Sequence, residues 1–249
     1  MPPELYHLTG FYQPFNAISH LLAALLFIFL GWKLLRRGHA HRASMAFLII
    51  YSAACIVLFI SSTLYHTFEV GGTTHRVMER LDHGAIFLLI AGTFTAVHGI
   101  MFNGWFRWVP LIIMWIVAAA CITLKVVFLD VLPEWLGLSF YLGLGWSVAL
   151  TAIPILGRYG FRYLLPILYG GLAYTVGAFM EYKGWVILIP RVIHAHEIWH
   201  IAVLIGALFH WRFVWDIAGD DRFLDVDQPA SPRQPWASTG PRMSRSKRG

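Results

Sequence analysis

Seven long apolar runs dominate the pattern of hydrophobic and polar positions along this chain. Each run approaches the roughly 20 residues that a helix needs to cross the hydrocarbon core of a bilayer. Backbone groups in lipid must form hydrogen bonds within the protein, and the runs lack the alternating pattern of a membrane β-barrel, so each run predicts a helix. The predicted spans are residues 16–35, 43–66, 82–102, 108–129, 135–156, 161–180 and 193–213.

The composition also indicates a membrane protein. Of the 249 residues, 58% are hydrophobic and only 13% are charged, whereas roughly a quarter of the residues in a soluble domain are charged. We therefore predict an all-α membrane protein whose seven-transmembrane helix bundle occupies residues 1–215 as one domain. Residues 216–249 are polar and rich in Pro, Ser and Arg, which predicts a disordered C-terminal tail. The net charge of +6 lies partly in this tail and comes without a basic-aromatic module, so no nucleic-acid partner is expected.

Ionisable residues of the spans gather at one face of the membrane. Because consecutive spans alternate in direction, the start of every odd span and the end of every even span lie on the same side. Two histidines, His98 and His210, end the third and seventh spans and so belong to the opposite face. The polar residues expected at the shared edge are Asn16, His20, His66, Asp82, His83, His194, His196 and His200.

The seventh span opens with HAHEIWH, residues 194–200, and this stretch predicts a metal site. His196 and His200 are four residues apart, so on a helix their directions differ by about 40° and both imidazoles can bind one ion. His66 ends the second span at matching depth and is the natural third ligand. Three nitrogens with an open fourth position are typical of a catalytic zinc, and no thiol lies at this depth. The alternative is a hydrogen-bonded pair of histidines at the membrane interface without a metal.

Two further residues are candidates for catalysis. Asp82, at the same edge, can hold or deprotonate a metal-bound water, although an acid just before the apolar run LDHGAIF is also typical of a helix N-cap. Ser62 precedes His66 by four residues and so shares its helix face. A serine inside a span is often only a packing or backbone-bonding residue, and it is the spacing to His66 that favours a role at the site.

The stretch HEIWH also matches H-E-x-x-H, the signature of zinc proteases in which the glutamate is the general base. An intramembrane zinc protease is therefore an alternative function. Such proteases need a third ligand, and the chain shows no pattern that supplies it in the way they do. On a helix, Glu197 is turned about 100° from His196 and so faces away from the histidine pair. We therefore assign the general base to Asp82 rather than to Glu197.

Four motifs occur in order along the spans: FNAISH in the first, SSTLYH at the end of the second, LDHGAIF in the third and HEIWH in the seventh. Together they resemble the hemolysin III branch of the progestin and adipoQ receptor family, from about residue 13 to about residue 215. The chain departs from that family in one place. An acid commonly stands three residues before the asparagine of the first span, and here the residue is Gln13.

This resemblance implies a seven-helix bundle in which His66, His196 and His200 hold one zinc ion, with Ser62 and Asp82 close to the metal water. Adiponectin receptors and alkaline ceramidases are relatives of the family, which implies hydrolysis of the amide bond of a ceramide-like membrane lipid. A receptor or transporter with a structural zinc is the main alternative. The branch name also records a haemolytic activity, but no residue pattern in the chain indicates a pore.

Basic residues in the loops predict the orientation. The face with the candidate site has four of them, and the opposite face has eight before the tail is counted. By the positive-inside rule the C-terminus is cytoplasmic and the site lies near the outer edge, the reverse of the arrangement in adiponectin receptors. We expect a bacterial inner-membrane protein. The four are Arg76, Arg80, Lys183 and Arg191, and the eight are Lys33, Arg36, Arg37, Arg42, Arg107, Arg158, Arg162 and Arg212.

Overall fold

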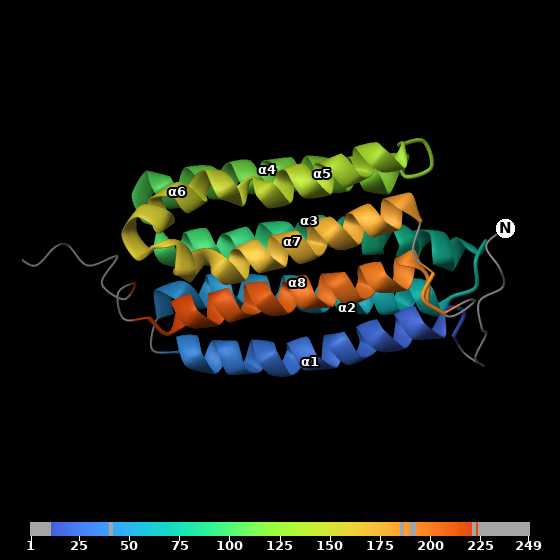
Figure 1. The fold of residues 1–249 in the computed structure, drawn as a ribbon, viewed down its shortest axis with the longest axis horizontal. Coiled ribbons are helices and arrows are strands. Elements are labelled where there is room, and N and C mark those ends of the chain that lie inside the picture. The colour runs from blue at the N-terminus through green and yellow to red at the C-terminus, as the bar shows by residue number, and fades with distance from the viewer. Residues whose placement is uncertain (1–10, 40–41, 185–186, 190–192, 221–222, 224–249) are drawn as a thin grey trace, which may run out of the picture.

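The computed structural model describes residues 11–39, 42–184, 187–189, 193–220 and 223, and helices dominate these residues (Figure 1). Seven spans are long and apolar enough to cross a membrane in this part of the chain, which confirms the predicted all-α seven-span fold. Arg191 and most of the predicted tail lie outside the described residues. The helices are α1 Pro14–Gly38, α2 Arg42–Thr67, α3 Thr73–Met101, α4 Gly104–Phe128, α5 Glu134–Trp146, α6 Val148–Tyr159, α7 Phe161–Lys183 and α8 Ala195–Ala218.

The outer surface of the bundle is apolar. Leu22, Ile116 and Leu150 are 61%, 64% and 77% exposed, which suits contact with lipid chains and would be an aggregation hazard in water. Polar side chains instead lie inside the bundle, where Asn16 and His66 are 0% and 2% exposed. Because polar groups inside a membrane are costly unless they are paired, such buried residues are candidates for a functional role.

The central helix of the bundle is α3, which contacts α2, α4, α5 and α8. The first helix packs against α2 and α8, and α7 runs along α8 (Figure 1). A glycine permits the close approach of α7 to α8, since a Cβ atom on Gly177 would lie 2.4 Å from the Cβ atom of Ala202. Close backbone contact at small residues is typical of helix pairs in membranes. It places the last turns of α7 directly against the first turns of α8.

The third span begins earlier than its apolar run. Helix α3 starts at Thr73, and Gly72 occupies its N-cap position. The prediction that Asp82 can cap this helix is therefore wrong, because Asp82 lies well inside it. The first turns of α3 carry polar residues such as His75 and Glu79. A hydropathy pattern detects only the part of a helix that is apolar enough for lipid, and so it missed these turns.

The fifth span was predicted as one helix over 135–156, and the structure divides it into α5 and α6 at Ser147. The Ser147 hydroxyl donates to the Leu144 carbonyl at 2.6 Å, and such local bonds compete with the helical pattern. Pro154 lacks the N–H that would bind the carbonyl four residues earlier. Together α5 and α6 still form a single span, Glu134–Tyr159.

Candidate metal centre

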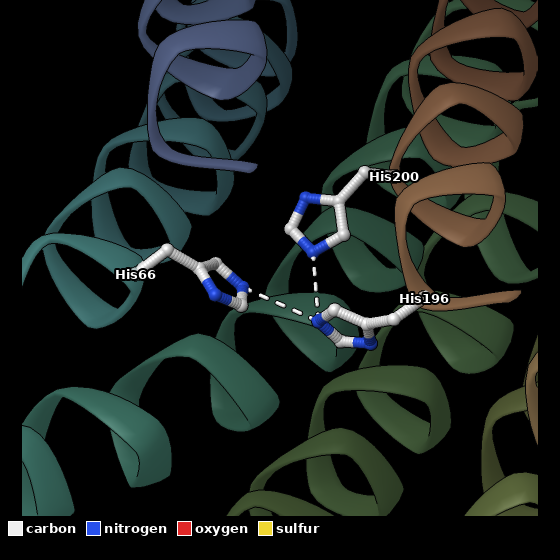
Figure 2. A group of neighbouring side chains, drawn as sticks. All are labelled: His66, His196 and His200. Atoms are coloured by element: carbon white, nitrogen blue, oxygen red, sulfur yellow. Dashed lines mark hydrogen bonds between the residues drawn. The ribbon is translucent and has the colours of Figure 1, made fainter. Parts of the chain in front are cut away.

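Three histidines from two helices meet at one end of the bundle. His66 is the second-last residue of α2, and His196 and His200 lie in the first two turns of α8. This is the end of the bundle where α2 finishes and α8 begins, at the right of Figure 1. Figure 2 shows the three rings pointing toward one another across the space between the two helices. One nitrogen from each ring lies within 4.8 Å of the other two.

The spacing of these nitrogens fits a metal ion. His196 Nε2 lies 3.4 Å from His66 Nε2 and 3.1 Å from His200 Nε2 (Figure 2). Two imidazole nitrogens bound to one tetrahedral zinc at about 2.05 Å stand about 3.3 Å apart. No cysteine or carboxylate joins the three nitrogens in the part of the chain that the structure describes. The group is therefore a three-nitrogen donor set whose fourth tetrahedral position has no protein ligand among those residues.

His66 is oriented by Gln13. The Nδ1 atom of His66 is hydrogen-bonded to the side-chain oxygen of Gln13, and the Gln13 backbone N–H donates to the His66 carbonyl at 3.0 Å. An amide oxygen can only accept, so His66 carries its proton on Nδ1 and directs the lone pair of Nε2 toward the cluster. A neutral amide thus supplies the acceptor at the position where the family pattern has an acid.

His196 is oriented by an acid that the sequence patterns did not single out. The Nδ1 atom of His196 donates to Glu181 Oε1, near the end of α7, at 2.9 Å. Both side chains are partly exposed, 37% for His196 and 38% for Glu181, whereas His66 and His200 are 2% and 3% exposed. The cluster is therefore reached from the side of His196. One signal in the sequence could have found Glu181, because it is the first residue after the predicted sixth span, at the shared edge, and the sole acid of α7.

His20 of α1 packs against the third ring. The ring centroids of His20 and His200 lie 4.0 Å apart, and His20 Nε2 donates to the His200 carbonyl at 3.4 Å. Both residues are 3% exposed. His20 thus supports His200 from the inside of the bundle, although its own nitrogens do not belong to the converging group.

The glutamate of the H-E-x-x-H pattern forms its hydrogen bonds with groups outside the three rings. Glu197 is 2% exposed. Its Oε1 atom accepts from Asn16 Nδ2 at 2.9 Å, and its Oε2 atom accepts from the backbone N–H of His194 at 2.8 Å. The second bond completes a capping box in which His194 is the N-cap of α8. Glu197 therefore fixes the start of α8 and ties it to α1, and His194 stays outside the helix and the cluster.

The two candidate catalytic residues, Asp82 and Ser62, come from α3 and α2. Asp82 is partly buried in α3, and its carboxylate interacts with the Ser62 hydroxyl and with the His196 ring. Ser62 is 2% exposed on α2. The next residue of α3, His83, is turned elsewhere, and its Nδ1 donates to the Glu79 carbonyl at 2.8 Å. The two candidate catalytic residues therefore interact with each other, and neither they nor His83 belong to the converging group of nitrogens.

The two histidines expected at the opposite face have other partners. The His98 ring stacks between Phe94 and Phe102, with ring centroids 4.0 and 4.7 Å apart. His210 Nε2 donates to the Ile167 carbonyl at 3.3 Å. Neither belongs to the converging group, so both positions are suitable controls for substitutions of the cluster.

An apolar cavity begins close to the cluster. Its volume is about 310 Å³, and it is lined by residues of α3, α5, α6, α7 and α8 with almost no polar surface. Its wall includes Ile86, one turn after Asp82 on α3, and Ala178, about one turn before Glu181 on α7. Trp199, next to His200 in the sequence, also lines it. The cavity wall therefore includes residues about one helical turn from Asp82 on α3 and from Glu181 on α7.

Known proteins are similar in sequence to this chain over nearly the whole bundle. A model of the family described as haemolysin-III related matches residues 12–211. Hemolysin-3 of Bacillus cereus is 32% identical over 197 residues, which cover 77% of this chain and 85% of that protein. The hemolysin-3 homolog of Bacillus subtilis (strain 168) is 30% identical over 200 residues, which cover 77% of this chain and 87% of that protein. The matched region contains every residue of the cluster and its partners.

Proposed function

The chain belongs to the haemolysin-III related family, whose members are integral membrane proteins of the progestin and adipoQ receptor group. We propose that it is a zinc-dependent hydrolase. The proposed substrate is a ceramide-like membrane lipid, and the bond cleaved is its amide. The family relationship supports the membrane setting, and the geometry at the end of the bundle supports the chemistry.

The convergence of three Nε2 atoms is the observation that carries this proposal. His66 and His196 each have an acceptor on Nδ1, so each directs an unprotonated Nε2 at the other across 3.4 Å. Lone pairs repel one another unless a cation lies between them. Zinc is the metal that fits best, because it accepts neutral imidazole in a tetrahedral site, and three ligands with an open fourth position are typical of catalytic zinc.

A zinc ion held there supplies a Lewis acid and a water acidic enough to act as a nucleophile near neutral pH. The Asp82 carboxylate interacts electrostatically with His196, and in this proposal it is the group that accepts the proton of the attacking water. The Ser62 hydroxyl holds that carboxylate in position. As the carbon–nitrogen bond of the amide breaks, Asp82 passes the same proton to the departing amine, so that one water yields a fatty acid and an amine.

The apolar cavity supports a lipid substrate. It lies between α3 and the helices α5 to α7, has a volume of about 310 Å³ and starts about one turn from Asp82. An acyl chain placed there would bring its carbonyl end toward the histidines. The exposed side of the cluster, at His196 and Glu181, would then receive the polar part of the lipid.

The alternatives have less support in the geometry. A protease of the H-E-x-x-H type needs the glutamate at the metal water, and Glu197 instead binds Asn16 and the start of α8. A receptor or transporter with a structural zinc is expected to close the metal shell with a fourth protein ligand. The three-nitrogen set has no such ligand among the described residues.

We further propose a bacterial inner-membrane location with a cytoplasmic C-terminus. The relatives are bacterial proteins. Basic side chains are concentrated on the face opposite the cluster, for example Lys33, Arg36 and Arg37 at the end of α1, as the positive-inside rule predicts for the cytoplasmic face. The candidate site then lies near the outer edge of the membrane.

The direct test of the proposed reaction is hydrolysis of lipid amides by the purified protein in mixed micelles. A fluorescent ceramide is the first substrate, with the matching ester and a peptide as comparisons. We expect release of the fatty acid from the ceramide, loss of this activity after chelation, and recovery when zinc is added. Peptide cleavage without lipid hydrolysis would favour the protease, and the absence of both activities in protein loaded with zinc would contradict the proposal.

A further inference from the structure

Each ring of the cluster has a different environment at Nδ1. The Nδ1 atom of His66 meets the neutral amide of Gln13. That of His200 is buried and has no hydrogen-bond partner among the described residues. That of His196 donates to the carboxylate of Glu181 at 2.9 Å. His196 is therefore the ring of the three whose Nδ1 proton is bound by a charged group.

We propose that Glu181 is a positioning residue that fixes the tautomer and the direction of His196 and thereby strengthens metal binding. This inference rests on the metal site of the proposed function. A carboxylate on the second nitrogen of a ligating histidine keeps the proton there, aims the other nitrogen at the metal and makes it a stronger donor. Glu181 acts through His196, because it contacts the side of the ring that faces away from the cluster.

The fold explains why this carboxylate can hold the ring. Glu181 lies one turn after Gly177, where the absence of a side chain lets α7 rest directly on Ala202 and Trp199 of α8. That contact sets the distance between the end of α7 and the start of α8. His196 is the most exposed of the three rings, so it has the least packing to restrict its rotation and depends most on a hydrogen bond.

Charge balance gives Glu181 a second role. A zinc ion bound by three neutral imidazoles brings two positive charges to the edge of the bilayer, where solvation is weaker than in water. Three carboxylates interact electrostatically with His196, namely Glu181, Glu197 and Asp82, and Glu181 alone among them forms a hydrogen bond with its ring. Glu181 would therefore contribute to offsetting the charge of a bound ion without occupying a ligand position.

Zinc affinity of the full-length protein in detergent tests this inference, measured by competition with a chromophoric chelator. Glu181→Ala removes the acceptor, and Glu181→Gln keeps an oxygen but loses the charge. Glu134→Ala is the matched control, since Glu134 is an exposed acid at the same end of the bundle, on α5. We expect about a 10- to 100-fold weaker affinity in Glu181→Ala, the usual effect of losing such a partner, an intermediate loss in Glu181→Gln, and no change in the control.

Two readouts separate positioning from a structural role. The melting temperature of the metal-free protein reports whether Glu181 merely joins α7 to α8, and we expect Glu181→Gln to match wild type. The visible spectrum of the cobalt-substituted protein reports the ligand geometry, and we expect it to change in Glu181→Ala. Equal zinc affinity in wild type and both Glu181 variants would overturn this inference alone. Failure of wild type itself to bind zinc would overturn the metal site, and the inference with it.

Discussion

His196 and His200 stand one turn apart on α8 with their Nε2 atoms 3.1 Å from each other. One helix thus supplies two ligands of a metal site with little adjustment, but it cannot supply the third. The third ring, His66, comes from the end of α2. A metal ion in this site would therefore join two helices that are far apart in the sequence, and both the proposed catalysis and part of the stability would depend on that link.

Asp82 and Glu197 are the two acids that compete for the role of general base, and substitution distinguishes them. We expect turnover of a lipid amide to fall by about 10² or more in Asp82→Asn, on the usual scale for a lost general base. We expect Glu197→Gln to retain most of the activity, because Glu197 is bound to Asn16 and His194. The measurement is the initial rate of hydrolysis of a fluorescent ceramide by wild type and by each variant, compared at equal zinc content. The opposite ranking would restore the protease-like role of the H-E-x-x-H glutamate.

Removal of the Glu197 carboxylate is expected to affect stability instead. In Glu197→Ala, the buried Asn16 amide loses its carboxylate and the first backbone N–H of the α8 cap loses its acceptor. The Asn16 amide keeps only its 3.5 Å contact with Gln13, and a buried polar group that loses its partner costs about 1–3 kcal/mol, so we expect a clear fall in the unfolding temperature of the detergent-solubilised protein. Glu69→Ala, at an exposed acid between α2 and α3, is the control. Equal melting curves for both variants and wild type would show that the bonds of Glu197 to Asn16 and His194 do not stabilise the fold.

Much of this arrangement follows from sequence patterns, for physical reasons. The length of a bilayer-spanning helix identifies the seven spans, and alternation of direction sorts Asp82, His66 and His196 to one edge. Helical geometry then places His196 and His200 on one face. These rules are local or depend on depth alone, so they need no knowledge of how the helices cross.

The partners of the ligands depend on helix crossings and were harder to predict. Glu181 reaches His196 because Gly177 lets α7 approach α8 closely, and no rule of spacing within one chain segment reveals that contact. Gln13 was recognised only as a departure from a family pattern. In the structure its amide oxygen accepts a hydrogen bond from His66 Nδ1. The start of α3 was misplaced because its first turns are too polar for a hydropathy pattern to detect.

Chelation is expected to destabilise the bundle, because the proposed metal ion would join α2 to α8. A ligand that binds only the folded state at 100 times its Kd adds about 2.7 kcal/mol to the free energy of unfolding. We therefore expect a chelator to lower the melting temperature in detergent and added zinc to restore it. A wild-type melting curve that is unmoved when all zinc has been removed would exclude a metal link between the two helices.

Acid should have the same effect as the chelator. Protons compete with the metal for the Nε2 lone pairs, so the stability due to zinc is present at neutral pH and is lost as the pH falls toward about 5. The difference in melting temperature between zinc-loaded and chelated protein should shrink over this interval. His196→Ala provides the control, because it reports the pH dependence of the rest of the bundle. A difference that stays constant down to about pH 5 would be inconsistent with imidazole ligands.

Zinc content of the purified protein, measured by elemental analysis, tests the central claim most directly. His66, His196 and His200 are each replaced by alanine, and His98→Ala and His210→Ala serve as controls because their rings lie outside the converging group. We predict about one zinc ion per chain in wild type and in both controls, as expected for one three-histidine site, and little or none in the three cluster variants. Zinc retained at the wild-type level in His196→Ala would contradict the account.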